Sequence, residues 1–398
     1  MTRMKESGID WIGQIPEEWR VTKLKYALLI SNGKDYKDIE VEEGGYPVIG
    51  SGGVFARARN YMYDGDVVLL GRKGTIDKPL FYSGKFWTVD TMFYSTALNG
   101  NNIKFMYYSS LLIPFSYYST ATALPSMTQS DLNNHVLCLP SISEQQKIAD
   151  FLDKKTAQLD KVKSLLEEQI QKLKDYRASL IYETVTKGLD KTVPMKDSGI
   201  DWIGEVPEGW EITKHKYIMT KVKEICAHYE GQDILSLTRQ GVVVRDIESG
   251  KGKMPASFDG YQFLEKGDLL FCLFDIDVTP RCVGVVENNG LTSSAYSRFR
   301  LDDKISVYYY YYLFLSMDED KVLLHLAKNL RHSLTEDDFG IIETVLPSYE
   351  EQLRIADYLG KVTKSIDEIV QLKQKQIDNI NKQRQTLIYD YVTGKRRV

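Results

Sequence analysis

The sequence predicts an α+β protein in which two mixed, β-rich domains are joined by two long helices, packed as an antiparallel intramolecular coiled coil. The main observation is a repeated box: the segment 4–26 returns at 195–217 with 16 of 23 positions identical. A second repeat relates 139–188 to 346–395. The order of box, variable region and helix therefore occurs twice, and we expect a pseudo-two-fold molecule.

The bulk composition is that of a globular protein with more than one core. A chain of 398 residues suits two or more domains, and 43% hydrophobic with 27% charged residues is ordinary for a soluble protein. No apolar run approaches the roughly 18 residues of a membrane helix, and the N-terminus has no secretory signal. We therefore expect a cytoplasmic protein with no membrane partner, whose four cysteines are reduced.

The first long helix is predicted over about 144–186, which contains neither glycine nor proline. Leucine recurs every seventh residue, at Leu152, Leu159, Leu166, Leu173 and Leu180. A second row is predicted between them, at Ile148, Lys155, Val162, Gln169 and Tyr176, and in the other copy at Ile355, Val362, Ile369 and Gln376. Each stripe needs a partner, so we expect the two helices to pair antiparallel, although the stripes could instead face other chains.

Both helices have a start signal. Pro140 and Pro347 block a helix upstream, and Ser141 or Ser143, and Ser348, are candidate N-caps. The tryptophans of the boxes are predicted to pack each box on a helix base, with partner docking as the alternative: Trp11, Trp19, Trp202 and Trp210. The predicted segments are a first domain over 1–140, a central helix over 141–188, a second domain over 189–346 and a C-terminal helix over 347–398.

The variable regions are predicted to be rich in strands separated by glycine and polar turns. Strand-like runs lie at 66–70, 241–245, 268–272 and 282–286. The tyrosine run 308–312 is predicted to form one wall of a helix or strand rather than a base-stacking strip. Short matches, such as 63–67 with 265–269, indicate that the two regions are one fold with diverged surfaces.

Motifs for catalysis or metal binding are missing from the sequence. It has no phosphate-binding loop or dinucleotide fingerprint, and its five histidines do not have zinc-ligand spacing. Asp64, Asp66, Asp275 and Asp277 could hold Mg²⁺, but turn formation is the favoured interpretation. No catalytic residue and no metal site is therefore predicted.

Polar loops with cations occur in both variable regions, and they suit contact with DNA. Arg presents a fork to guanine, Gln pairs with adenine, and Ser, Lys and glycine N–H groups hold phosphates. The candidates are Ser51, Arg57, Arg72 and Lys73 in the first region, and Arg239, Gln240, Arg245, Arg281 and Ser294 in the second. The wider set includes Lys251, Lys253, Arg298 and the run 328–333. The alternative for each is an ordinary solvated loop.

The repeats resemble the specificity (S) subunits of type I restriction-modification systems. The resemblance rests on SGIDWIG followed by P-E-x-W in both boxes, and on LPS-x-x-EQ-x-[KR]-IAD-[FY]-L before each long helix. It covers both boxes, both helices and the order of the regions. The variable regions match target recognition domains of that family in position and size, but not residue by residue.

The resemblance implies a subunit that is not itself an enzyme. Each target recognition domain would read one half of an asymmetric, split site in double-stranded DNA, while the helices set the spacer. The conserved parts would dock two modification (methyltransferase) subunits, and restriction (translocase and nuclease) subunits would join them. No cofactor is expected on this chain; S-adenosylmethionine, ATP and Mg²⁺ are expected in the partner subunits.

Two other functions remain open at this stage. The paired helices could tether two ligand-binding modules that do not bind DNA, in which case affinity for DNA would be low even at modest salt. The aspartates could instead make the chain a nuclease, which would cut DNA on its own with Mg²⁺. For the favoured interpretation, a rod of roughly 65 Å and half-sites about one DNA turn apart are the expected geometry.

Overall fold

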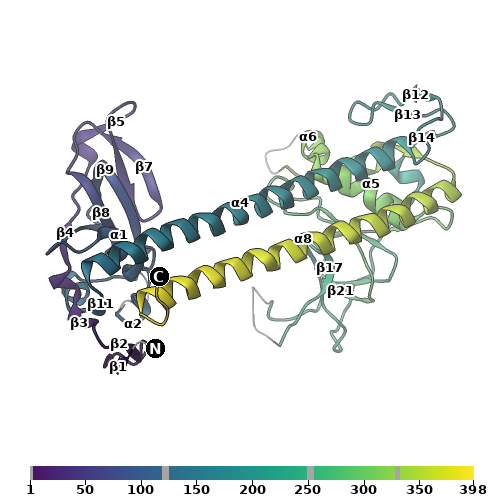
Figure 1. Cartoon of the computed structure of the whole chain (residues 1–398). Coiled ribbons are helices and arrows are strands. Elements are labelled where there is room, and N and C mark those ends of the chain that lie inside the picture. Colours follow the sequence, from purple (N-terminus) through teal and green to yellow (C-terminus); the bar gives the residue numbers. More distant parts are fainter. Residues whose placement is uncertain (1–2, 119–124, 249–254, 328–331) are drawn as a thin grey trace. The chain divides into compact units, whose positions relative to one another are not determined.

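The computed structural model divides into two compact units, coloured along the sequence in Figure 1. It describes residues 3–118, 125–248, 255–327 and 332–398. Unit 1 comprises Met1–Leu166 and Gln374–Val398, and unit 2 comprises Glu167–Lys373. Both long helices, α4 (Ile142–Lys187) and α8 (Tyr349–Val392), contribute one half to each unit. None of the described helices combines the length and the apolar character needed to cross a bilayer.

Unit 1 is built on a seven-stranded sheet, within its described residues, in the order β4-β10-β8-β9-β6-β7-β5. Neighbouring strands are antiparallel except β6 and β9, which are parallel. Helix α1 packs on β8, β9 and β10, and the strands β1–β2 and β3–β11 form separate pairs. The strands are β1 (Met4–Glu6), β2 (Gln14–Pro16), β3 (Arg20–Lys23), β4 (Leu28–Asn32), β5 (Glu40–Val41), β6 (Tyr46–Gly50), β7 (Gly53–Ala58), β8 (Tyr63–Gly71), β9 (Leu80–Thr88), β10 (Met92–Ala97) and β11 (Val136–Leu139). The shorter helices are α1 (Ile103–Ser110), α2 (Phe115–Tyr118) and α3 (Gln129–Asn134).

Unit 2 repeats this plan with shorter strands. Its central sheet has the order β15-β22-β19-β20, which corresponds to β4-β10-β8-β9 of unit 1, and β14–β23 corresponds to β3–β11. The strands are β12 (Met195–Asp197), β13 (Glu205–Pro207), β14 (Glu211–Lys214), β15 (Met219–Val222), β16 (Leu235–Thr238), β17 (Gly241–Val244), β18 (Gln262–Leu264), β19 (Leu269–Phe271), β20 (Val283–Val285), β21 (Gly290–Thr292), β22 (Ser297–Leu301) and β23 (Glu343–Leu346). The shorter helices are α5 (Val307–Glu319), α6 (Val322–Leu326) and α7 (Glu336–Gly340).

The local structure agrees with several sequence predictions. The four strand-like runs fall on β8, β17, β19 and β20. The tyrosine run lies on α5, where Tyr309 and Tyr310 are fully buried, so it is a helix wall. The hydroxyls of Ser141 and Ser348 accept from the backbone N–H three residues later, which identifies Ser141 rather than Ser143 as the first N-cap. All four cysteines are free and buried.

A Glu-Gln pair in the first turn of each long helix holds the surrounding elements together. In unit 1 the indole Nε1 of Trp19 donates to Glu144 at 3.2 Å, and in unit 2 that of Trp210 donates to Glu351 at 3.0 Å. Both tryptophans are buried, which confirms that they pack a box on a helix base. Trp11 differs, because it is 39% exposed.

The glutamine of the pair anchors the first helix of the variable region. In unit 1 the amide of Gln145 accepts from the backbone N of Asn102, the N-cap of α1, at 2.9 Å. In unit 2 Gln352 accepts from the N of Ser306, the N-cap of α5, at 2.8 Å. The same glutamines donate to the carbonyls of the prolines that precede the long helices. Each long helix is thereby tied to its β-rich region through buried polar groups.

The halves of α4 and α8 run antiparallel within each unit, which confirms the predicted pairing. In unit 1 the start of α4 lies against the end of α8, and the rings of Phe151 and Tyr391 are 4.5 Å apart. In unit 2 the end of α4 lies against the start of α8, where Ile181 and Ile355 share one core. Matching ion pairs occur in the two units, Arg384–Asp160 at 3.5 Å and Arg177–Asp367 at 3.3 Å.

The second row of the predicted heptad was wrong. Val162 and Tyr176 are 47% and 56% exposed, Lys155 and Gln169 are exposed, and in α8 Ile369 is 43% exposed. Buried or half-buried aliphatic residues instead recur every eleven residues, at Ile148, Leu159, Ile170 and Ile181 in α4, and at Ile355, Ile366, Ile377 and Ile388 in α8. An eleven-residue period is 3.67 residues per turn, so the stripe stays on one face of a nearly straight helix where a heptad would drift.

His215 fills a position that is apolar in the other copy of the box. It aligns with Leu24 of unit 1, is fully buried, and its Nδ1 donates to the carbonyl of Phe339 at 2.9 Å. Its Nε2 has no partner. Burial lowers the pKa of His215 to about 3, because the apolar surroundings penalise the imidazolium.

The stability of unit 2 should therefore depend on pH through His215. The buried imidazole of His215 resists protonation in the folded state. The contribution of neutral His215 to the free energy of unfolding is therefore complete above the unfolded pKa of about 6.5. It is lost progressively as pH falls toward 3, by about 1.4 kcal/mol per pH unit. Between pH 7 and pH 5 the loss should reach about 2 kcal/mol. Replacement of His215 by leucine should narrow the gap between the melting temperatures at the two pH values. An unchanged gap in thermal melts would contradict this prediction.

Candidate nucleic-acid interface

The first candidate surface is a hairpin turn that occupies the same place in both units. In unit 1 the side chain of Thr88 donates to the carbonyl of Ile49 on β6 at 2.7 Å, and in unit 2 that of Thr292 donates to Leu235 on β16 at 2.9 Å. Because each threonine makes the same contact with the first strand of a hairpin, the β6–β7 and β16–β17 hairpins occupy equivalent places in the two units. The second strand of each begins with a glycine at positive φ, 104° in one and 106° in the other, where other residues are strained.

The two hairpin turns carry different candidate residues. Ser51 lies half-buried in the β6–β7 turn, between glycines. Arg239 and Gln240 form the β16–β17 turn and are exposed. The Thr238 side chain accepts from the backbone N of Gln240 at 3.2 Å, which fixes the turn and leaves both long side chains at its tip. The equivalent tips therefore present a small hydroxyl in unit 1 and two hydrogen-bonding side chains in unit 2.

The second candidate surface is the loop after the central strand of each sheet. In unit 1 the carbonyl of Arg72 accepts from the N of Met127 at 2.9 Å, and in unit 2 that of Leu273 accepts from the N of Leu334 at 2.8 Å. The loops are thus equivalent. Arg72 is half-buried, with its guanidinium 5.8 Å from the ring of Phe93 and a bond to the carbonyl of Asp90. Lys73 is exposed.

Arg57 lies on β7 rather than on a loop. Its guanidinium is exposed and donates to the carbonyls of Gly44 and Gly45, at 3.4 and 3.3 Å. These weak bonds bend the side chain along the strand and leave most donors of the fork facing solvent. Arg57 is therefore displaced along the hairpin from the turn that holds Ser51.

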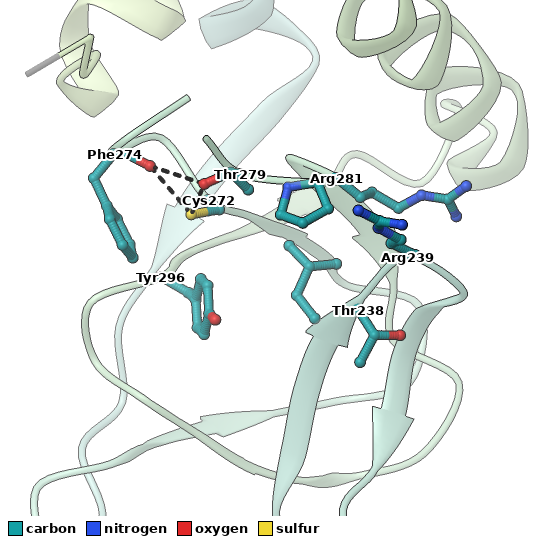
Figure 2. Close-up of a pocket in the computed structure, with 9 residues that line it drawn as sticks. Thr238, Arg239, Cys272, Phe274, Thr279, Arg281 and Tyr296 are labelled. Carbon is teal, nitrogen blue, oxygen red and sulfur yellow. Dashed lines mark hydrogen bonds between the residues drawn. The ribbon is translucent and has the colours of Figure 1, made fainter. Parts of the chain in front are cut away.

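Two of the candidates of unit 2 line a small pocket of about 190 Å³ (Figure 2). Arg239 and Arg281 line it, together with the rings of Phe274 and Tyr296, whose centroids are 5.9 Å apart. The Nη1 of Arg281 donates to the hydroxyl of Tyr311 at 3.2 Å, so this side chain is held by α5. The pocket is smaller than an ordinary small-molecule site and suits the edge of a larger ligand.

The remaining candidates of unit 2 do not line this pocket. Arg245 follows β17, and its backbone N donates to the carbonyl of Ile234 at 2.7 Å. Ser294 is exposed in the turn that precedes Tyr296. Sequence reasoning selected the candidates by residue type alone, and the structure brings two of them, Arg239 and Arg281, to one pocket.

Arg298, a member of the wider set of cations, is not available to a ligand, and this prediction was wrong. Its side chain is fully buried, with Nε 2.5 Å from Asp268 and Nη2 3.0 Å from Glu265. Arg300 joins the same two carboxylates at 3.1 and 2.9 Å. Arg298 and Arg300 share one face of β22, and only Arg298 is buried there, against Asp268, which the sequence did not reveal. Lys251, Lys253 and the run 328–331 lie outside the described residues.

Aspartates do not form a metal site in the parts of the chain that the structure describes, where no three metal-ligating side chains gather. Asp64 and Asp66 lie on strand β8, so the expectation that they form a turn was wrong. Asp275 has φ of 49°, as a turn residue can, and Asp277 lies 3.3 Å from His332.

Sequence reasoning missed the exposed aromatic and apolar residues beside the candidates. Phe55 on β7 is 56% exposed, Phe274 is 37% exposed, and Val278 in the loop after β19 is 73% exposed. The signal was present as apolar residues next to glycine and charged turns, but periodicity alone assigns such residues to the core.

The chain matches a family model described as the type I restriction modification DNA specificity domain, over residues 16–174. It is also similar to two proteins of Methanocaldococcus jannaschii. The putative type I restriction enzyme MjaX specificity subunit is 25% identical, over 97% of this chain and 96% of the relative. The type I restriction enzyme MjaVIII specificity subunit is 24% identical, over 97% and 94%.

Over nearly its whole length the chain is therefore similar to type I DNA specificity subunits. The fold of the chain is also that of a chain from a structure described as the basis of complex assembly and conformational transition of the type I R-M system. The two share a TM-score of 0.69 at 13% identity, over 95% of this chain and 98% of the other. The predicted fold class is thereby confirmed, and the family model and the relatives agree with the resemblance seen in the sequence.

Proposed function

We propose that this chain is a type I DNA specificity subunit, and that it reads an asymmetric, bipartite site in double-stranded DNA, one half with each unit. The observation that supports this proposal is the different chemistry at equivalent places. The hairpin turn carries Ser51 in one unit and Arg239 with Gln240 in the other. Two copies of one fold with unlike tips suit two unlike half-sites, because direct readout depends on the donors and acceptors presented to the base edges.

The nine candidate residues are proposed as the DNA-contacting set. Arg57, Arg72 and Lys73 would hold phosphates beside the first half-site, with Ser51 at its turn. Around the second half-site, Arg239 and Gln240 would reach base edges, with Arg245, Arg281 and Ser294 beside them. Since each mismatched base pair costs about 1–3 kcal/mol, two readers in one chain multiply specificity.

The long helices are proposed to set the spacer and to dock the partner subunits. Two modification subunits, with S-adenosylmethionine, and restriction subunits, with ATP and Mg²⁺, would assemble on the repeated boxes and helices. The proposed domain limits follow the predicted segments 1–140, 141–188, 189–346 and 347–398. The chain itself is proposed to be non-catalytic, without a bound cofactor, and to act in the cytoplasm. Purified alone with Mg²⁺, it should not cut DNA.

Exchange of residues 27–138 for those of a related specificity subunit tests this proposal. Methylome sequencing of cells that carry the complete system should show one half of the modified site replaced, with the other half and the spacer unchanged. The matched exchange of residues 218–345 should replace the other half. A site that stays the same after both exchanges would refute the assignment of one half-site to each unit.

A further inference from the structure

The β6–β7 hairpin of unit 1 breaks the alternation of its strand. Val54 and Phe55 are consecutive, yet both are 56% exposed. The strand register explains this: Val48 pairs with Ala56 and Ile49 pairs with Val54, so Phe55 is an extra residue without a partner. This β-bulge turns two successive apolar side chains toward solvent, and bulges with that effect are common beside functional sites.

The ring of Phe55 is held in a defined direction. A Cβ atom at Gly50 would lie 3.2 Å from its Cε1, so the ring covers the glycine backbone of the turn. The ring of Tyr36 meets it edge to face, with centroids 5.4 Å apart and planes at 89°. Lys37 lies 5.0 Å from the Tyr36 ring. Phe55 is therefore a positioned, exposed aromatic residue beside cations, rather than a loose surface side chain.

The apex of the unit 1 hairpin offers few hydrogen-bonding groups for base readout. Its turn consists of glycines and Ser51, followed by Val54 and Phe55. The equivalent apex of unit 2 carries Arg239 and Gln240. A hairpin that enters a DNA groove in both units would thus meet the bases through hydrogen bonds in unit 2 and through apolar contact in unit 1.

We propose that Val54 and Phe55 determine specificity in the first half-site by packing on the C5-methyl group of a thymine in the major groove. This inference rests on the proposed function of unit 1. The thymine methyl is the apolar group on the major-groove edges of the bases, and a phenyl ring is among its recognised partners. Packing against a cytosine or guanine edge would instead leave polar groups buried without partners.

Cations near the hairpin fit a nucleic-acid occupant. Arg57 is exposed on β7 beyond the apex, and Lys34 is exposed in the segment beside it, where the indole of Trp87 donates to the carbonyl of Lys34 at 2.8 Å. Lys37 of the same segment pairs with Glu40 at 3.3 Å. Such cations can hold the phosphates that flank the contacted base. A DNA duplex is therefore the occupant to which the proposal commits.

The test uses the complex of the full chain with its modification subunits and duplexes that contain the mapped site. Each thymine of the unit 1 half-site is replaced in turn by deoxyuridine, which lacks the methyl group. At one position the wild-type complex should lose about four-fold in affinity, as expected for one buried methyl group. The Phe55→Ala complex should bind the two duplexes equally. A half-site without an A·T pair, or one in which no replacement weakens binding, overturns the proposal.

Methylome sequencing supplies the second readout. Phe55→Ala and Val54→Thr should relax one position of the unit 1 half-site and leave the unit 2 half unchanged. Leu29→Ala is the matched control, because Leu29 is 53% exposed on β4, the opposite edge strand of the same sheet. Melting temperatures check that the variants fold. A rise in 2-aminopurine fluorescence without any effect of the methyl group would indicate an inserted wedge and overturn the thymine contact.

The two levels of the proposal can fail separately. If exchange of residues 27–138 changes one half-site while Phe55→Ala and Val54→Thr leave both halves intact, this inference fails and the proposed function stands. If the exchange itself leaves the site unchanged, the proposed function fails.

Discussion

Replacement of Asp268 by alanine is expected to lower the free energy of unfolding of unit 2 by about 3–5 kcal/mol. Asp268 is 1% exposed and receives both Nε of Arg298, at 2.5 Å, and Nε of Arg300, at 3.1 Å. Arg298 has a fully buried side chain, and its other carboxylate partner, Glu265, is half-exposed. Loss of Asp268 would leave a desolvated guanidinium without adequate compensation. Chemical denaturation, with hydrogen exchange to locate the effect in unit 2, measures the change.

Unit 1 provides a matched control for this substitution. The segment Gly65–Val67 matches Gly267–Leu269, so Asp66 is the counterpart of Asp268, but it is exposed on β8. Asp66→Ala should therefore change stability by no more than about 0.5 kcal/mol. Equal effects of the two substitutions would show that the buried charge cluster does not stabilise unit 2.

Replacement of Gln145 by leucine is expected to destabilise unit 1 by about 2–5 kcal/mol. The buried amide accepts from the N of Asn102 at 2.9 Å and donates to Asn101 and to the carbonyl of Pro140, at 3.0 and 3.1 Å. Leucine has a similar size but pairs with none of these groups, and each buried polar group left unpaired costs about 1–3 kcal/mol. Hydrogen exchange should rise first in α1, whose N-terminus loses its anchor.

The neighbouring glutamine is the control. Gln146 is exposed, so Gln146→Leu should have little effect on stability even though its side chain contacts Asn102 and Asp150. Gln352→Leu should reproduce the large effect in unit 2, because Gln352 makes the equivalent bonds to Ser306 and Pro347. If Gln145→Leu and Gln146→Leu are equally mild, the buried amide is not the link between α1 and the long helix.

Much of the fold could be predicted because it occurs twice. The repeated box and helix segments gave the two-domain plan, and proline and serine before each helix gave its start near Pro140 and Pro347. The packing face of the long helices was harder to predict. Leucines seven residues apart fall on one helix face whether the buried positions recur every seven or every eleven residues. Only the exposure of Val162 and Tyr176 distinguishes the two periods.

The candidate site was less accessible to sequence reasoning. Residue type selected Arg239 and Arg281 for one surface, and they do share a pocket. The same criterion selected Arg298, which tertiary structure turns inward onto Asp268. It also passed over Phe55, because an exposed phenylalanine is recognisable only once the bulge in β7 has been located. Burial and strand register, rather than composition, decide these cases.

The eleven-residue period makes the long helices modular in length. Removal of one eleven-residue block shortens a helix by about 16 Å, since each residue adds about 1.5 Å. The isoleucines on either side of the deletion, such as Ile355 and Ile377, would still fall on a common stripe. Matched deletions or duplications in both helices should thus keep the stripes in register, whereas a grafted leucine zipper would wind the pair in the opposite sense.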